Sequence, residues 1–156
     1  MHASPHHNRA VLTLAGARVE DAARAVVTEG VRRIDLRRHV GVHPRLGAVD
    51  VVPFVPLDGS SMNDALAARN RFAAWAAADL GVPCFLYGPE RTLPDVRRHA
   101  FTGLAPDFGG PAAHPTAGAI CVGARPVLVA YNVWLAGGVG VATAREIARD
   151  IRGPAL

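Results

Sequence analysis

The chain has 156 residues, half of them apolar and 19% charged, so it can bury a core and is too apolar to be disordered. Its formal net charge is +4, and every basic residue is an arginine. The arginines are scattered, without a run of five or more and without interleaved aromatic residues, which disfavours nucleic-acid binding and suits a small acidic ligand. No apolar run approaches the roughly 20 residues of a membrane span. The start "MHASPHHNRAVLTLAG" lacks a signal-peptide core, so we expect a cytosolic protein without a membrane partner.

Hydrophobic periodicity divides the first half of the chain into strand, helix and strand. Residues 9–16 predict a β-branched strand that ends at a glycine. Apolar residues then recur at helical spacing over residues 17–36, although a glycine interrupts them. Residues 48–57 predict a second strand, which its two prolines confine to a sheet edge or a bulge.

The second half continues with a helix over residues 61–80, capped by one of the two serines at its start. A short buried strand follows at 83–88, and then a long loop with one short helix at 89–118. Residues 119–135 predict two strands around a Gly-Ala-Arg-Pro turn, hence an antiparallel hairpin. Residues 141–151 predict a closing amphipathic helix.

This order of elements favours the α+β class, with helices packed on one face of a mixed or antiparallel sheet. A doubly wound parallel sheet is disfavoured, because the expected hairpin is antiparallel and no glycine-rich turn follows the first strand. The glycines of residues 137–140 lack the Lys-Ser/Thr end of a phosphate-binding loop. We expect one domain over residues 1–156.

The cysteines and the paired histidines give no metal site. Cys84 and Cys121 lie in apolar, strand-like stretches, so we expect buried free thiols rather than a disulfide or a metal pair. The neighbours His6 and His7 suggest metal binding. However, adjacent side chains on a strand point to opposite faces, and no cysteine or carboxylate completes a ligand set.

The stretch "GVHPRLGAVDVVPFVPL", residues 41–57, places His43, Pro44 and Arg45 where a loop turns into a strand. Pro44 restricts His43 to an extended backbone and so presents the imidazole on a stiff support. An imidazole titrates near neutral pH and can shuttle a proton between two nitrogens. Gly47 lets the chain approach a bound molecule closely. Spacing alone also fits an exposed loop histidine beside an arginine in an ordinary surface ion pair.

Several stretches, taken in order, resemble the amino-terminal subdomain of the formiminotransferase family. They are "HPRLGAVDVVPFVPL", "VPCFLYG", "RTLPDVRR", "LAPDFGG" and "GAICVGARPVLVAYNVWL". The resemblance runs from about Asn8 to Arg152, and the stretch that begins at His43 is its most specific part. It implies a ferredoxin-like α/β sandwich. It also implies that the family's first strand and helix and its carboxy-terminal subdomain are missing from this chain.

The resemblance further implies transfer of a formimino group between N5 of tetrahydrofolate and the amine of L-glutamate, as in histidine degradation. In this reading 5-formiminotetrahydrofolate is the co-substrate, and no metal takes part. His43 falls on the family's catalytic histidine, and Arg45 and Arg9 are candidates to bind the carboxylates of glutamate or folate. Besides Gly47, the residues assigned to folate or substrate binding are Gly109, Gly110, Pro111, Ala112, Ala113, His114, Pro115, Thr116, Ala117 and Gly118.

The chemistry of such a transfer agrees with a histidine. An incoming ammonium must lose a proton before its nitrogen attacks an amidine carbon, and a folate nitrogen must gain a proton to leave. One imidazole can do both in turn, and such proton transfers contribute roughly 10²–10⁴-fold to the rate.

Two other functions stay open. The chain could be a non-catalytic folate-binding or assembly module that retains the fold, or a transferase with a different acyl or imidoyl donor. The expected partners are folate, L-glutamate, and either a second copy of the chain or a separate chain with the carboxy-terminal subdomain. An exposed strand edge at residues 9–15 would favour self-association.

Overall fold

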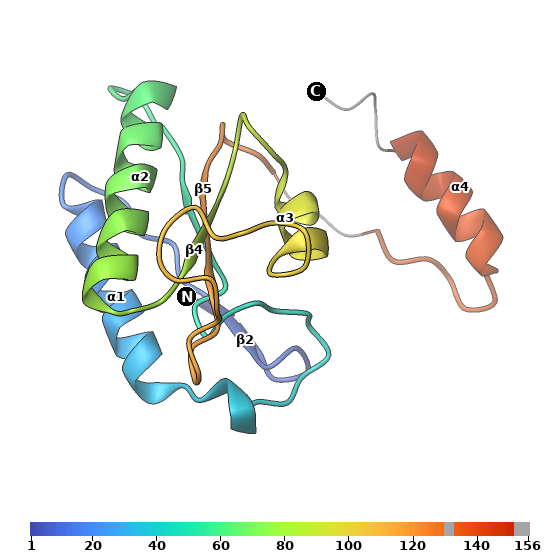
Figure 1. Cartoon of the computed structure of the whole chain (residues 1–156). Helices are drawn as coiled ribbons and strands as arrows, with labels where there is room; N and C mark the ends of the chain where they lie inside the picture. Colours follow the sequence, from blue (N-terminus) through green and yellow to red (C-terminus); the bar gives the residue numbers. More distant parts are fainter. Residues whose placement is uncertain (130–132, 152–156) are drawn as a thin grey trace.

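A three-stranded parallel sheet forms the centre of the computed structural model, which describes residues 1–129 and 133–151 (Figure 1). The strands are β3 (Val51–Phe54), β4 (Cys84–Tyr87) and β5 (Ile120–Ala124). β5 lies between the other two and pairs in parallel with both. Every residue of β4 and β5 is buried, so these two strands anchor the fold.

Helices cover both faces of this sheet. α2 (Met62–Asp79) packs on all three strands, and α1 (Val19–Arg33) packs on α2. α3 (Leu93–His99) packs on β4 and β5 from the other side (Figure 1). The connection from β3 to β4 through α2 moves two strand positions along the sheet. The connection from β4 to β5 through α3 moves one position back. Crossovers of the same hand that run in opposite directions place their helices on opposite faces.

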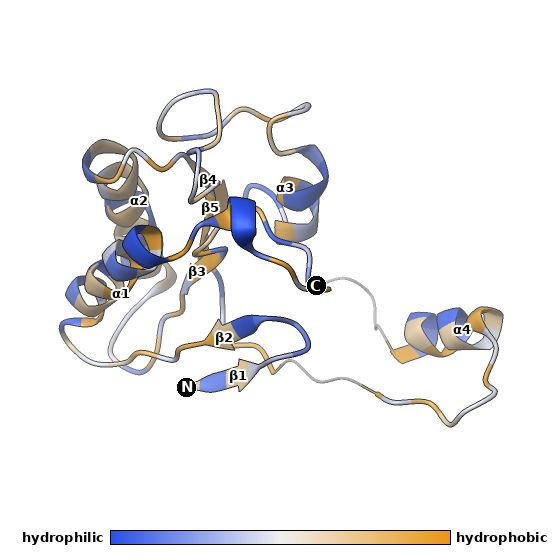
Figure 2. Cartoon of the chain, turned by 90° about the horizontal axis from the view of Figure 1, so that it is seen from below, coloured by the Kyte–Doolittle hydropathy of each residue, from blue (hydrophilic) through white to orange (hydrophobic). Residues whose placement is uncertain are grey.

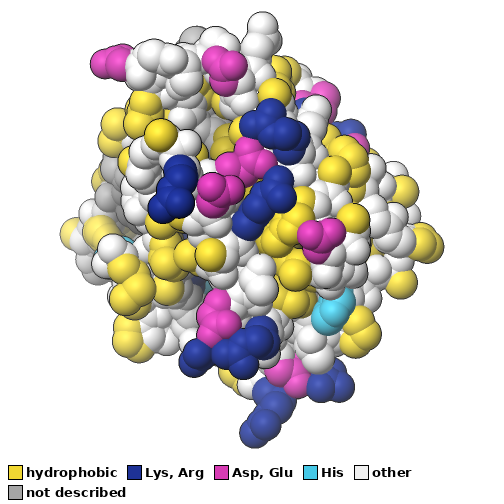
Figure 3. Space-filling model, turned by 90° about the vertical axis from the view of Figure 1, so that its left-hand side faces the viewer, with side chains coloured by type: hydrophobic (Ala, Val, Ile, Leu, Met, Phe, Trp, Pro, Cys, Tyr) yellow, Lys and Arg dark blue, Asp and Glu magenta, His cyan; other side chains and the backbone are white. Residues whose placement is uncertain are grey.

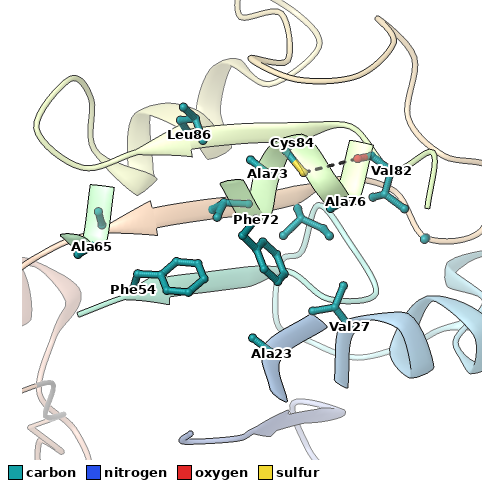
Figure 4. Close-up of a cluster of buried hydrophobic side chains, with 14 residues drawn as sticks. Ala23, Val27, Phe54, Ala65, Phe72, Ala73, Ala76, Val82, Cys84 and Leu86 are labelled. Atoms are coloured by element: carbon teal, nitrogen blue, oxygen red, sulfur yellow. Dashed lines mark hydrogen bonds between the residues drawn. The ribbon is translucent and has the colours of Figure 1, made fainter. Parts of the chain in front are cut away.

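Alternate residues of β4 divide the core into two clusters. Cys84 and Leu86 face α2, whereas Phe85 and Tyr87 face α3. On the α2 side, the fully buried Phe72 packs edge-on against Phe54, with their ring centroids 5.6 Å apart (Figure 4). The sheet is therefore buried on both faces, as strands with continuous apolar runs require.

The predicted cap of α2 is confirmed, and Ser61 provides it. The Ser61 hydroxyl accepts a hydrogen bond from the Asp64 amide at 3.2 Å. The Asp64 carboxylate accepts one from the Ser61 amide at 2.8 Å, which completes a capping box. Ser60 instead donates to the carbonyl of Leu57, at 2.8 Å, in the preceding turn.

The predicted arrangement of the sheet is wrong in two respects. Helices lie on both faces rather than one, and the three-stranded sheet is parallel. Antiparallel pairing is confined to a separate hairpin of β1 (His2–Ser4) and β2 (Arg9–Val11). The chain is thus a mixture of helices with one parallel and one antiparallel sheet, and the ferredoxin-like sandwich is not confirmed.

The hairpin predicted over residues 119–135 does not form in the part of the chain described. β5 ends at Ala124, residues 125–129 and 133–135 contain no strand, and residues 130–132 lie outside the described residues. The reason is that β3 and β4 already occupy both edges of β5, so no edge remains for an antiparallel neighbour.

The terminal segments depart from the sheet. The strand predicted over residues 9–16 shortens to β2, and His6 and His7 lie in the turn before it rather than on a strand. α4 (Val141–Ile151) forms as predicted but contacts no other described helix or strand, and it stands apart in both views (Figures 1 and 2). Within the described ranges, no helix combines the length and apolar character needed to cross a membrane.

We predict that both cysteines resist thiol reagents in the native protein. Cys84 and Cys121 are free and buried, as expected from the sequence. Burial raises the pKa of each thiol to about 12, so almost no thiolate exists at neutral pH. Labelling with a chromogenic disulfide at neutral pH should be negligible without denaturant and complete in guanidinium. Rapid labelling of the native chain would contradict this placement.

Candidate functional site

His43 lies in an irregular segment, residues 41–50, that leads into β3 and is called the histidine loop below. Its side chain is half-buried. The Arg45 guanidinium folds back on the loop and donates to the His43 carbonyl oxygen from Nε at 3.1 Å and from Nη2 at 2.9 Å. These two bonds close a tight turn around Pro44 and restrain the backbone that carries the imidazole.

The β1–β2 hairpin brings Arg9 to His43. Nη1 of Arg9 lies 2.9 Å from Nε2 of His43. A guanidinium can only donate, so Nε2 must accept, and a neutral His43 in this contact carries its proton on Nδ1. The ring of His7 stands beside His43, with 6.3 Å between the centroids. Nε2 of His43 is therefore a proton acceptor in this arrangement.

The resulting cluster of His7, Arg9, His43 and Arg45 carries uncompensated positive charge. No carboxylate of the described residues forms an ion pair with any of the four. Nη1 of Arg45 is buried without a hydrogen-bond partner among them. Partial desolvation, followed by the charges of His6, Arg9 and His43, lowers the pKa of His7 below its usual value. Such a cluster suits a carboxylate or another small anion.

The segment predicted to bind folate, residues 109–118, is called the folate loop below, and its end joins the histidine loop directly. The Ala119 amide donates to the Leu46 carbonyl at 3.0 Å, and the Ala48 amide donates to the Ala117 carbonyl at 2.9 Å. Gly47 and Gly118 face each other across this pairing. A side chain at Gly47 would overlap the Ala119 carbonyl, so only glycine fits there.

His114 shapes the folate loop from within. Its Nδ1 accepts hydrogen bonds from the amides of Ala117 at 3.1 Å and Thr116 at 3.3 Å. Its own amide and carbonyl pair with those of Gly118, at 2.8 and 2.9 Å. Nδ1 must be unprotonated to accept, so this histidine holds the loop in shape as a neutral side chain. The residues of the loop whose side chains or backbone are exposed are Gly109, Gly110, Pro111, Ala112, Ala113 and Pro115.

The two predicted segments, the histidine loop and residues 109–118, border the amino ends of the parallel strands, whereas Arg9 reaches His43 from the β1–β2 hairpin. The histidine loop precedes β3, Gly109 packs against Pro83 just before β4, and Gly118 lies just before β5. The structure therefore brings the two segments to the same end of the sheet, and Gly47 and Gly118 into contact.

A cleft of about 480 Å³ lies at the opposite, carboxyl ends of β4 and β5. Its walls are largely apolar, and none of the predicted site residues lines it. We place the candidate site at the histidine loop, because the groups able to move a proton and bind an anion gather there. The residues that line the cleft are Met62, Tyr87, Gly88, Pro89, Arg91, Thr92, Leu93, Ala124, Arg125, Pro126 and Leu128.

Sequence reasoning missed two residues that support the histidine loop, Asp50 and Arg97. Arg97 donates from Nη1 to the Pro44 carbonyl at 2.9 Å and pairs through Nη2 with the Asp50 carboxylate. Asp50 stands inside the most specific stretch of the sequence. No local pattern connects it with an arginine 47 positions later.

The outer face of α1 and α2 carries basic and acidic side chains in mixed groups (Figure 3). Glu20 pairs with Arg24 at 2.7 Å and with Arg71 at 2.8 Å, and Glu29 pairs with Arg32 at 2.7 Å. Because acids interrupt the arginines, this face does not offer the continuous positive patch that nucleic acids bind.

In residues 1–129 and 133–151, no three histidine, cysteine or acidic side chains gather closely enough to hold a metal ion. The site therefore consists of a histidine, two arginines and a glycine-bordered loop. Together they define an α/β module suited to bind a small acidic molecule and move a proton.

Comparison with known proteins places this module in a family. Residues 1–125 match the N-terminal subdomain of the formiminotransferase domain. The chain belongs to the formiminotransferase family, as its sequence motifs suggested.

Relatives share this part of the chain at similar identities. Glutamate formimidoyltransferase of Streptococcus pyogenes is 38% identical, with 94% of this chain and 54% of that protein covered. The enzyme of the same name from Thermoplasma acidophilum is 35% identical, with 83% and 48% covered. Formimidoyltransferase-cyclodeaminase of Rattus norvegicus is 37% identical, with 84% and 27% covered. The chain thus spans about half the length of the first two relatives.

We predict that a methyl group at Gly47 or Gly118 destabilises the fold. Gly118 has φ +71°, and side chains at both positions would overlap backbone carbonyls that cannot move aside. Gly47→Ala and Gly118→Ala should each lower the free energy of unfolding by about 1–3 kcal/mol, measured by denaturant titration. Gly110→Ala is the control, because nothing lies near its added methyl group. Equal stability of all three variants would show that the two loops do not meet as described.

Proposed function

We propose that this chain is the folate-binding half of a formimino transferase that acts on 5-formiminotetrahydrofolate and L-glutamate. The observation that carries the proposal is His43, which is held with Nε2 as a proton acceptor inside a cluster of uncompensated positive charge. Family membership supports it, since the relatives are named glutamate formimidoyltransferase and formimidoyltransferase-cyclodeaminase.

His43 acts as the proton carrier in this proposal. Its neutral imidazole takes a proton from the glutamate ammonium, and the freed amine attacks the formimino carbon. The bond from that carbon to N5 of the folate then breaks as the imidazolium returns the proton to N5. The products are N-formiminoglutamate and tetrahydrofolate, and the reverse transfer runs through the same steps in opposite order.

Arg9 and Arg45 bind carboxylates in this scheme. Arg9 is exposed, and within the described residues its side chain hydrogen-bonds to His43 alone, through Nη1, so a carboxylate can engage its guanidinium as the substrate enters. Arg45 supports the turn at His43 with two of its nitrogens, while its third nitrogen has no partner. Residues 109–118 form the folate loop, which His114 keeps in shape and Gly47 contacts at its end.

A further subdomain, whether on this chain, on a separate chain or on a second copy of this one, completes the site. The family match ends at residue 125, and most side chains of residues 127–129 and 133–135 are apolar and exposed. Trp134 is 92% exposed, and α4 buries no residue. Exposed apolar segments of this kind are typical of surfaces that a partner covers.

A non-catalytic folate-binding or assembly module is the second candidate. The observation in its favour is that Nε2 of His43 already accepts a hydrogen bond from Arg9 and so is not open to a substrate ammonium in this arrangement. Folate binding that persists without any transfer, even in the presence of a carboxy-terminal subdomain of a relative, would favour this candidate.

We predict that the isolated chain binds tetrahydrofolate or its 5-formyl analogue weakly. The residues proposed to bind the ligand lie on one side of it, so part of the ligand stays in water. Titration calorimetry should give a dissociation constant in the micromolar range or weaker. A nanomolar constant would contradict the prediction and indicate a site completed within the chain or by dimerisation.

We predict that His43→Ala abolishes transfer in any assembly in which the wild-type chain is active. Because the imidazole is needed in the transition state, the rate should fall by roughly 10²–10⁴-fold, while folate affinity and the circular dichroism spectrum stay unchanged. Arg45→Ala should mainly raise the KM for the carboxylate substrate. The control is His99→Ala, an exposed histidine at the end of α3.

Retained turnover in His43→Ala, or loss of its fold, would show that the histidine is structural. The catalytic assignment would then be wrong even if folate binds.

A further inference from the structure

Arg97 belongs to α3, which packs on the face of the sheet opposite to α2. Its side chain extends to the backbone of the histidine loop. Its guanidinium bridges two acceptors, the Pro44 carbonyl at 2.9 Å from Nη1 and the Asp50 carboxylate from Nη2. The planar guanidinium fork can hold two acceptors in fixed directions, which a lysine ammonium cannot do. One side chain therefore sets the position of the residue directly after His43.

Asp50 holds the other end of the same turn. Its Oδ1 accepts hydrogen bonds from the amides of Leu46 at 2.6 Å and Gly47 at 3.4 Å. Its carbonyl accepts from the Cys121 amide at 2.9 Å, which fixes Asp50 to the buried central strand. The pair thus ties both ends of the Pro44–Gly47 turn to the core.

We propose that Arg97 and Asp50 are positioning residues for His43, an inference that rests on the proposed function. Neither residue contacts the imidazole. They act through the backbone. Because the φ angle of Pro44 is fixed, holding the Pro44 carbonyl in place leaves the His43 backbone little conformational freedom. The two side chains are only 24% and 20% exposed, so water screens their attraction less than it screens a surface ion pair.

A second ion pair in the same molecule allows a matched comparison. Arg91 and Asp107 are 26% and 22% exposed and 2.8 Å apart, and Asp107 also accepts a backbone hydrogen bond, from the Leu86 amide at 2.7 Å. This pair fixes a loop to β4 in the same way but makes no contact with the histidine loop. If the Arg97–Asp50 pair only stabilises the fold, its removal should affect His43 no more than removal of the Arg91–Asp107 pair does.

The test is nuclear magnetic resonance of the full chain with isotope-labelled histidine. In the wild-type chain, a neutral His43 that accepts from Arg9 carries its proton on Nδ1. Arg97→Ala should shift the His43 ring nitrogen signals toward the tautomer mixture of a free imidazole. It should also speed hydrogen exchange at the amides of Leu46 and Gly47 by at least about 10-fold.

Arg91→Ala should leave the His43 signals and both exchange rates unchanged. Arg97→Lys keeps the charge opposite Asp50 but loses one of the two acceptors, so it should give an intermediate His43 spectrum and serves if Arg97→Ala does not fold. Unchanged His43 signals in a folded Arg97 variant, or an equal shift in Arg91→Ala, would overturn the proposal.

Kinetics separate this inference from the proposed function. In an active assembly, Arg97→Ala should lower kcat on the order of 10²-fold, with little change in KM, and Arg97→Lys should recover part of the loss. A wild-type chain that never transfers would count against the proposed function, and the His43 spectra would still decide the positioning role. Wild-type transfer with unaltered turnover in Arg97→Ala would refute the positioning role alone.

Discussion

The main-chain pairing of β5 is the constraint on which the site depends. Both edges of β5 bond to neighbouring strands, and the residues around its start extend this pairing to the histidine loop through Leu46 and Asp50. A buried segment that is paired on both sides cannot slide without breaking hydrogen bonds on each side. The loop that carries His43 is therefore fixed relative to the core by backbone contacts, before any side chain contributes.

Local features of the fold could be predicted from the sequence, whereas the strands that pair with each other in the sheet could not. The Ser61 cap and the helix at residues 141–151 could be predicted, because capping and amphipathic spacing depend on neighbours a few positions away. Local features could not show whether the antiparallel hairpin predicted at residues 119–135 would form. An apolar run shows that a segment is suited to a strand, but it does not show that β3 and β4 occupy both of its edges.

The sequence singled out His43 as the candidate reactive group, which stays a prediction, and it did not reveal the residues that support the histidine loop. Spacing around His43 left an ordinary loop histidine open, and only the long motif starting there favoured the catalytic interpretation. The contact between Arg9 and His43 joins segments 34 positions apart, and Arg97 approaches from another layer of the fold. Such supports leave no local pattern, because folding alone brings them together.

The exposed apolar side chains of residues 127–129 and 133–135 affect how the chain behaves in a crowded cell. In the isolated molecule, Trp134 and the apolar face of α4 are exposed to water. They can therefore associate with other exposed apolar surfaces. Non-specific association through such surfaces leads to aggregation. Burial of these side chains against another surface therefore protects the chain from aggregation as well as removing apolar area from water.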